Sequence, residues 1–387
     1  MALIRFARRL LILVAADALV LKTSAGPVGN TTLPVYSGAA LPAAVSSMTS
    51  SNNVLNVVQS GNRAVINWDS FSIGTSARLV VDQPRGSILL NVAGGGISQI
   101  NGAISGPLYG SNYAATNGAV WIINPSGLIF GAGSTVNVGS LLLSTLPLTF
   151  NDPAGGRFRF EQNTQPASIV LNGSINASPP PGTSSVGDPW VAPGSIVAMS
   201  PTITQGSTSV LSAHRDVRLL ASDSVQLNID GAGLITTTLS KSSVNTLLTT
   251  QGAIKVTDGT IELSSMGQRI AGLSLVNLGG EIQSLGPRNN IYLNAPYGNY
   301  TITGKVTPGP IGQLIITYLP DEESSASQQA GGIKSEQAPP NENKPGDGII
   351  VESPVLAPLP NQPPTPQSRD PEEEPKRVAP APRPAPV

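Results

Sequence analysis

The stretch from Ala64 to Thr145 contains three segments, AVINWDSFSIG at 64–74, VVDQPRGSILLNVAGGGISQINGAISG at 80–106 and VWIINPSGLIFGAGSTVNVGSLLLST at 120–145. Each segment consists of short runs of Val, Ile and Leu, separated by Gly, Asn, Ser, Asp and Pro. Such runs are typical of short β-strands joined by turns. Similar runs occur from Leu33 to about Ile316. We therefore expect one all-β body there, as a sandwich, a barrel or a β-solenoid.

Asn124, Pro125, Ser126 and Gly127 lie between the apolar runs VWII and LIF. This residue order is typical of a type I turn, because Pro presets its backbone angle and the Asn side chain can bond the backbone two residues on. The sequence therefore predicts a tight corner between two strands.

Internal similarity favours the solenoid over the other two folds. One pattern recurs near Asn172, Gln205 and Asn277. It consists of a strand-like run that ends in Asn, Gln or Leu, followed by Gly and then by another apolar residue. A coil repeating about every 20 residues would place these segments at one corner, with alternating apolar side chains inside. Corner asparagines could form stacked amide ladders, or they could be ordinary loop residues. The sequence leaves both interpretations open.

The composition agrees with a β-rich protein that has few charged surfaces. Only 12% of the residues are charged and 4% are aromatic. Helix-rich folds are therefore not expected, and the core must consist mainly of Val, Ile, Leu and Ala. A formal net charge of -1 gives no long-range field that would attract nucleic acid or anionic lipid. The absence of cysteine excludes disulfides and thiol chemistry.

Several motifs follow one another in a specific order. They are INWDSFSIG at 66–74, QP at 83–84, LN at 90–91, SQINGAI at 98–104, the Asn124 turn and VNVG at 136–139. In this order they resemble the N-terminal secretion domain of the filamentous haemagglutinin family, the exported partners of two-partner secretion systems. Ser72 and Ser126 replace asparagines usual in the family, and the arginine usual shortly after Asn91 is missing. The family's second Asn-Pro-Asn-Leu motif is not found, which leaves the subgroup open.

The resemblance implies a right-handed parallel β-helix, delivery to the periplasm by the Sec machinery and export through an outer-membrane β-barrel of the Omp85 type. It also implies an adhesin-like role outside the cell or at its surface, with a host-surface or glycan receptor, and no cofactor or metal. The residues that it marks for transporter recognition or folding are Asn67, Trp68, Phe71, Gly74, Gln83, Pro84, Asn91, Asn124, Pro125, Ser126, Gly127, Asn137 and Gly139.

The two ends of the chain differ from its centre. Three arginines precede the apolar run 10–21, which predicts a signal peptide over 1–25; a buried helix is the alternative. A secretion domain over 26–230 and further β-helix coils over 231–320 are expected to follow. The segment 321–387 is rich in polar residues and proline, which predicts a disordered tail. Two insertions, at 108–118 and 178–190, are expected to leave the coils.

Enzymes that cleave polysaccharides also occur among parallel β-helices, and they need clustered carboxylates. Asp216, Asp223, Asp230 and Asp258 are scattered, so we interpret them as solvated turn residues. His214 is the only histidine, which excludes a multi-histidine metal site, and HRDVRLL is typical of a turn that enters a strand. We therefore expect an exported non-enzymatic protein. A β-helix that binds or cleaves polysaccharide is the alternative.

Overall fold

The computed structural model describes residues 28–318, apart from 153–154, 163–165, 179–193, 231–233, 241, 243–245 and 268–273, together with 350–352. The predicted signal peptide, the insertion beyond Ser178 and all of the Pro-rich tail except 350–352 lie outside these residues. Within the described part of the chain the regular elements are all β-strands.

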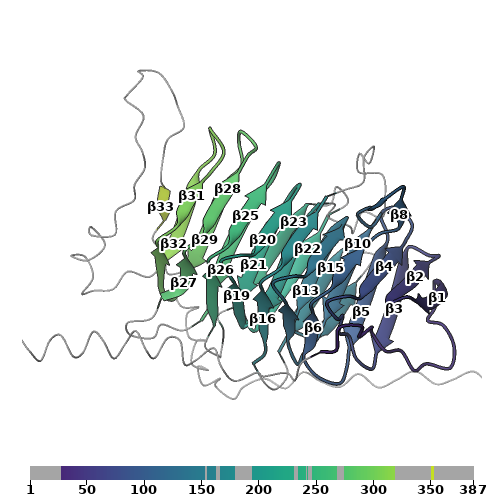
Figure 1. The fold of residues 1–387 in the computed structure, drawn as a ribbon. Helices are drawn as coiled ribbons and strands as arrows, with labels where there is room; N and C mark the ends of the chain where they lie inside the picture. The colour runs from purple at the N-terminus through teal and green to yellow at the C-terminus, as the bar shows by residue number, and fades with distance from the viewer. Residues whose placement is uncertain are drawn as a thin grey trace, which may run out of the picture. The chain divides into compact units, whose positions relative to one another are not determined.

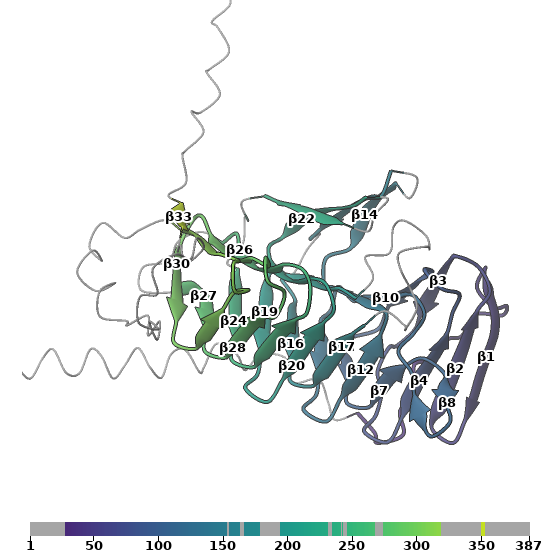
Figure 2. The ribbon, with the colours of Figure 1, turned by 90° about the horizontal axis from the view of Figure 1, so that it is seen from above.

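Three sheets, here called sheets 1, 2 and 3, wind around a common interior, and each coil passes from sheet 1 to sheet 2 to sheet 3 (Figures 1 and 2). Sheet 1 contains β3 (Arg63–Trp68), β5 (Ile88–Ala93), β10 (Ala119–Ile123), β13 (Ser140–Ser144), β18 (Ile196–Ser200), β21 (Val217–Ala221), β26 (Ile261–Ser265), β29 (Ile291–Ala295), β32 (Leu314–Tyr318) and β33 (Ile350–Glu352). Sheet 2 contains β6 (Ser98–Ile100), β11 (Leu128–Phe130), β16 (Ser168–Leu171), β19 (Thr202–Gln205), β24 (Leu247–Thr250), β27 (Ser274–Leu278) and β30 (Asn299–Ile302).

Sheet 3 contains β1 (Val45–Ser51), β2 (Val54–Gln59), β4 (Arg78–Asp82), β7 (Ala103–Ser105), β12 (Thr135–Val138), β17 (Ser174–Ala177), β20 (Val210–Ala213), β25 (Ala253–Val256), β28 (Glu281–Ser284) and β31 (Lys305–Thr307). Neighbouring strands of sheets 1, 2 and 3 pair in parallel, except that β1 pairs antiparallel with β2 at the N-terminal end. This arrangement confirms the predicted parallel β-helix.

The length of one coil can be read from the strand register. Ala119 pairs with Ser140 and Ile196 pairs with Val217, so the chain returns to the same place in sheet 1 after 21 residues. The return from Leu141 to Ile196 takes 55 residues, because further segments are inserted there. The predicted repeat of about 20 residues is therefore the length of a coil without insertions.

The core is a stack of apolar side chains inside the coils. In sheet 3 the register places Leu79, Ile104, Val136 and Ile175 above one another, and each is at most 2% exposed. Successive side chains of a strand point to opposite faces, so every second residue of each strand contributes to this interior. Burial of apolar area at about 25 cal/mol per Å² is then repeated coil by coil.

Glycines form a column at the corner between sheets 2 and 3. A Cβ atom at Gly102, Gly173, Gly252, Gly280 or Gly304 would overlap backbone atoms of the preceding coil. Only glycine permits this close approach of two backbones. The Oδ1 atoms of Asn101 and Asn172 lie over Gly131 and Gly206 of the following coil. The recurring Gly therefore marks a corner as predicted, but these asparagines stack on glycine and not on one another.

A fourth, antiparallel sheet, here called sheet 4, covers part of the outer face of sheet 1 (Figure 2). It consists of two hairpins inserted after β13 and after β21: β14 (Leu148–Asp152) with β15 (Arg157–Glu161), and β22 (Ser224–Ile229) with β23 (Ile235–Leu239). Its apolar side chains pack on outward-facing residues of sheet 1, among them Trp121, whose ring centroid lies 5.0 Å from that of Phe158. All five residues of each of β10, β13, β18, β21 and β26 are consequently buried.

Most of the apolar runs are strands as predicted, with three differences. The run VQLNI, expected in a coil, lies in β22 of sheet 4, where it pairs antiparallel with β15. The insertion 108–118 contains a short hairpin, β8 (Leu108–Tyr109) and β9 (Asn112–Tyr113). The segment predicted as a disordered tail contains β33, which pairs with β32.

Candidate functional site

The Asn124 turn has the local structure that its sequence predicts. The amide of Gly127 donates to the carbonyl of Asn124 at 3.0 Å, which closes a four-residue turn. The amide of Ser126 donates to Oδ1 of Asn124 at 2.8 Å, which is the expected side-chain bond two residues on. The turn joins β10 of sheet 1 to β11 of sheet 2.

The side chain of Asn124 also joins this turn to the preceding coil. Its Nδ2 donates to the carbonyl of Gly96 at 2.7 Å and to Oγ of Ser98 at 2.8 Å. The backbone amide of Asn124 donates to the carbonyl of Ser144 in the following coil at 2.9 Å. Asn124 is completely buried, so these bonds are shielded from water. One residue thus connects three successive coils.

A second group of motif residues lies in the first two coils. Nε1 of Trp68 donates to Oδ1 of Asn91 at 2.9 Å, and Nδ2 of Asn91 donates to the carbonyl of Trp121 at 3.1 Å. The Trp68 ring also packs against Tyr36 and Phe71, with centroid distances of 6.3 and 5.6 Å. Trp68, Phe71 and Asn91 are buried, so this group links β3, β5 and β10 from the inside.

The remaining motif residues stabilise individual corners. Gly74 has no room for a Cβ atom because the carbonyls of Gly29 and Asn30 lie against it. Nε2 of the buried Gln83 donates to the carbonyl of Ser87 at 3.2 Å. Each of these contacts holds the backbone where one strand ends and the next begins.

Pro84 and Gly139 make further corner contacts, and Asn137 makes a contact between strands of sheet 3. The Ser87 hydroxyl donates to the carbonyl of Pro84 at 2.7 Å. The amide of Gly139 donates to Oγ1 of Thr116 at 3.0 Å. Asn137 accepts a bond from Nδ2 of Asn176 in the next coil at 2.9 Å, which forms one step of an amide ladder on sheet 3.

The thirteen motif residues therefore do not converge on one cleft. They are distributed over the first coils, and most are buried contacts within or between coils. Asn67, Pro125 and Ser126 are the exposed members of this set. Ser98, which accepts from Asn124, was not selected from the sequence, because a bond between coils leaves no local sequence signal.

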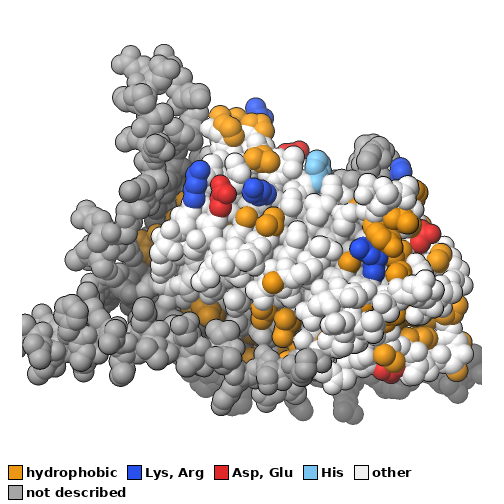
Figure 3. Space-filling view, in the orientation of Figure 1, with side chains coloured by type: hydrophobic (Ala, Val, Ile, Leu, Met, Phe, Trp, Pro, Cys, Tyr) orange, Lys and Arg blue, Asp and Glu red, His pale blue; other side chains and the backbone are white. Residues whose placement is uncertain are grey.

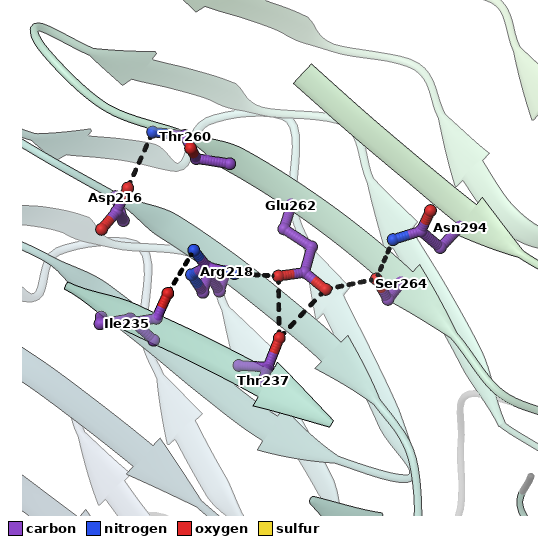
Figure 4. Close-up of polar contacts among 8 residues, drawn as sticks. All are labelled: Asp216, Arg218, Ile235, Thr237, Thr260, Glu262, Ser264 and Asn294. Atoms are coloured by element: carbon purple, nitrogen blue, oxygen red, sulfur yellow. Dashed lines mark hydrogen bonds and ion pairs between the residues drawn. The ribbon is translucent and has the colours of Figure 1, made fainter. Parts of the chain in front are cut away.

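A buried ion pair fixes sheet 4 to sheet 1 (Figure 4). Arg218 of β21 and Glu262 of β26 occupy paired positions, and Nη1 of Arg218 bonds Oε2 of Glu262. Nη2 of Arg218 also donates to the carbonyl of Ile235 at 3.0 Å, and the Thr237 hydroxyl donates to Oε2 of Glu262 at 3.0 Å. Ile235 and Thr237 belong to β23, so the pair connects the two sheets.

The carboxylates considered for an enzyme do not form a metal-binding group. No group of three or more His, Cys, Asp or Glu side chains that could hold a metal occurs in the described part of the chain. Asp216 is a turn residue, but the prediction that it is solvated is wrong: it is 4% exposed, and its Oδ1 accepts from the Thr260 amide at 2.8 Å. His214 is exposed in the turn between β20 and β21, as HRDVRLL predicts. On the face shown in Figure 3 the charged side chains are few and dispersed.

The family model described as TPS secretion domain, for two-partner secretion, matches residues 33–268. The chain belongs to this family. It therefore carries the secretion domain of a two-partner secretion exoprotein, and the predicted resemblance is confirmed. TPS secretion domains are not a family of enzymes, and the family implies an outer-membrane transporter as partner.

Individual proteins agree with this assignment. A heme/hemopexin-binding protein of Haemophilus influenzae is 28% identical over 121 residues, which is 31% of this chain and 12% of that protein. The TPS chain thus spans a small part of the length of this relative. The crystal structure of the HMW1 secretion domain from Haemophilus influenzae is similar with a TM-score of 0.55 and 21% identity, covering 72% of this chain and 68% of that one. This second likeness supports the β-helix fold.

A third comparison concerns the filamentous hemagglutinin secretion domain. Its crystal structure gives a TM-score of 0.37 at 14% identity, covering 74% of this chain and 97% of that chain.

Within the described residues no helix is long and apolar enough to cross a membrane.

Proposed function

We propose that this TPS protein is recognised in the periplasm by an outer-membrane transporter of the Omp85 type and is exported through its barrel. The Sec machinery would deliver it to the periplasm, where residues 1–25 would be removed. The observation that carries the proposal is the Asn124 turn, whose side chain bonds the turn itself and the coil before it.

The motif residues support a role in folding more than a role as a contact surface. Trp68, Asn91 and Asn124 are buried and bond from one coil to the next. Contacts of this kind are made once a second coil stacks on the first. We infer that they establish the first coils, onto which each later coil can add its ladder and its apolar residues. The transporter would then bind surface residues of the first coils, such as the exposed Asn67.

Coil formation outside the cell would favour outward movement of the chain. A chain with 12% charged residues carries few charges through the barrel. Each coil that forms outside buries apolar area worth about 25 cal/mol per Å², which opposes sliding back. Export would therefore need no nucleotide.

After export we propose an adhesin-like role outside the cell or at its surface, with a host-surface or glycan receptor. The heme/hemopexin-binding relative is matched over 12% of its length, so its ligands are not transferred to this chain. The alternative, a β-helix that binds or cleaves polysaccharide, is not favoured by the family match, and the described acidic residues form no group of three that could hold a metal ion for cleavage.

The test follows a C-terminally tagged chain into cell, periplasm and medium, with and without the candidate transporter. Transporter-dependent appearance outside the cell is expected. The variant Asn124→Ala removes three side-chain bonds and should cost about 2–3 kcal/mol of folding free energy, and its export should be slower than that of the unaltered chain.

Ser126→Ala is the matched control for the same turn, because only the backbone amide of Ser126 takes part in the Asn124 bond. Its export rate should remain normal. Export at equal rates for Asn124→Ala and Ser126→Ala would contradict the folding role. Equal export without the transporter would contradict the two-partner proposal itself.

A further inference from the structure

The last complete coil leaves part of the apolar interior uncovered. In sheet 2, Val276 and Leu278 of β27 are at most 1% exposed, whereas their register partners Tyr300 and Ile302 of β30 are only partly buried. In sheet 3 the same change occurs between Ile282 and its partner in β31. The corresponding positions of the preceding strands point inward, so their partial burial means that the described residues supply no complete further layer above them.

Sheet 1 shows the same change, with one difference. Ile291 and Ala295 of β29 are at most 1% exposed, while their partners Leu314 and Tyr318 of β32 are partly buried. In contrast to β30 and β31, however, β32 has a further parallel partner, because Ile315, Ile316 and Thr317 pair with the three residues of β33. One of the three open sheet edges is therefore occupied by a later part of the same chain (Figure 1).

The separation of β32 and β33 along the chain lies within the range found between other paired strands of sheet 1. Ile315 pairs with Ile350, a separation of 35 residues, and separations in sheet 1 otherwise extend from 21 to 55 residues. Glu352 and Pro354 are residue types that discourage addition of another strand, because proline lacks the amide and charge opposes edge pairing.

We propose that β33 is a C-terminal cap on sheet 1, which occupies the open edge of β32 and prevents a second copy of the chain from pairing there. An uncapped edge of β32 beside partly buried apolar residues would be a template for strand addition from another molecule. The occupant is a segment of the same chain because its effective concentration near β32 far exceeds that of a second molecule.

The test compares two double variants of the complete chain. Ile350→Pro with Val351→Pro removes two consecutive amides, so whichever one faces β32 is lost. Ile350→Thr with Val351→Thr retains both amides and a high β-propensity, and is the matched control. Hydrogen exchange of β32 and β21 is measured for both, together with the molar mass in solution by light scattering.

The proline variant should lose protection in β32 by about tenfold or more and should associate into dimers or larger species. The threonine variant should stay monomeric with β32 protected, and β21 should remain protected in both, which shows that the coils are folded. Unchanged β32 protection and a monomeric proline variant would overturn the proposal. A dimeric unaltered chain with β32 at the interface would also overturn it, because a second copy would then be the occupant.

Discussion

Single residues hold this protein together by bonds that cross from one coil to the next. The sequence predicted the turn at Asn124, since Pro125 and Gly127 specify it locally and the Ser126 amide bonds the Asn124 side chain. It could not predict that the same side chain reaches Ser98, because that contact depends on the length of a coil. For the same reason Asp216 was expected in solvent, although the following coil covers it.

Gly280→Ala tests the close approach at the corner between sheets 2 and 3. The added Cβ atom would overlap the carbonyl oxygen of Gly252, and two backbones cannot separate without breaking ladder bonds. We expect a loss of about 1–3 kcal/mol in the free energy of unfolding, measured with urea.

Gly133→Ala is the control for this substitution, because the nearest atom to its Cβ would be the Asn101 carbonyl oxygen at 3.9 Å. Its unfolding free energy should stay within about 0.5 kcal/mol of the unaltered protein. Equal midpoints for the two variants would show that the corner can widen without cost.

At the scale of elements, the sequence predicted strands better than it predicted their partners. The runs in β10, β13 and β18 consist of consecutive apolar residues with serine only at their ends, which is typical of strands buried on both faces. That pattern indicates a cover over sheet 1 but does not say what forms it. The cover depends on antiparallel pairs such as Phe160 with Val225, which no local turn specifies.

Glu262→Ala should destabilise the junction of sheets 1 and 4 strongly. The substitution leaves Arg218 buried without its carboxylate, at an expected cost of about 3–5 kcal/mol. Replacing both residues by Met should restore much of that loss, because no charge remains buried. Urea unfolding of the two variants decides the matter, and a double variant as unstable as Glu262→Ala would refute this explanation.

The last coil should give the protein a specific sensitivity to alkali. Burial, and to a lesser degree the nearby Tyr318, raise the pKa of Tyr300 above its usual 10.0. The folded chain therefore holds this proton at a pH where the unfolded chain releases it. The contribution of the Tyr300 proton to the free energy of unfolding is therefore fully present below pH 10.0. It should be lost as the pH rises above that value.

Thermal unfolding measured across this pH range provides the check. Tyr300→Phe should reduce the decline, because phenylalanine cannot ionise. Tyr109→Phe, at an exposed position of the β8–β9 hairpin, should leave the decline in place. An equal decline in all three proteins would assign the alkaline effect to other groups.

For the molecule as a whole, the sequence was sufficient for the repeat but not for the interruptions. Strand-like runs separated by Gly and Asn predicted coils of about 20 residues, and coils of 21 residues occur where nothing is inserted. The pairing of β15 with β22 and of β32 with β33 was not predicted, because the paired residues lie 35 or more positions apart along the chain. Local sequence patterns therefore predict the strands of each coil. Sheet 4 and β33 depend on pairing between strands that are far apart along the chain.

The two hairpins of sheet 4 leave the coils at β13 and β21 and pair with each other across β18, which lies between those strands in sheet 1. A simple stack of coils would fray from its ends, one layer after another. Here the layers that contain β13, β18 and β21 cannot separate unless β15 and β22 also part. The middle of the stack is therefore expected to open as one cooperative block, and a chain pulled back from outside would meet its main resistance there.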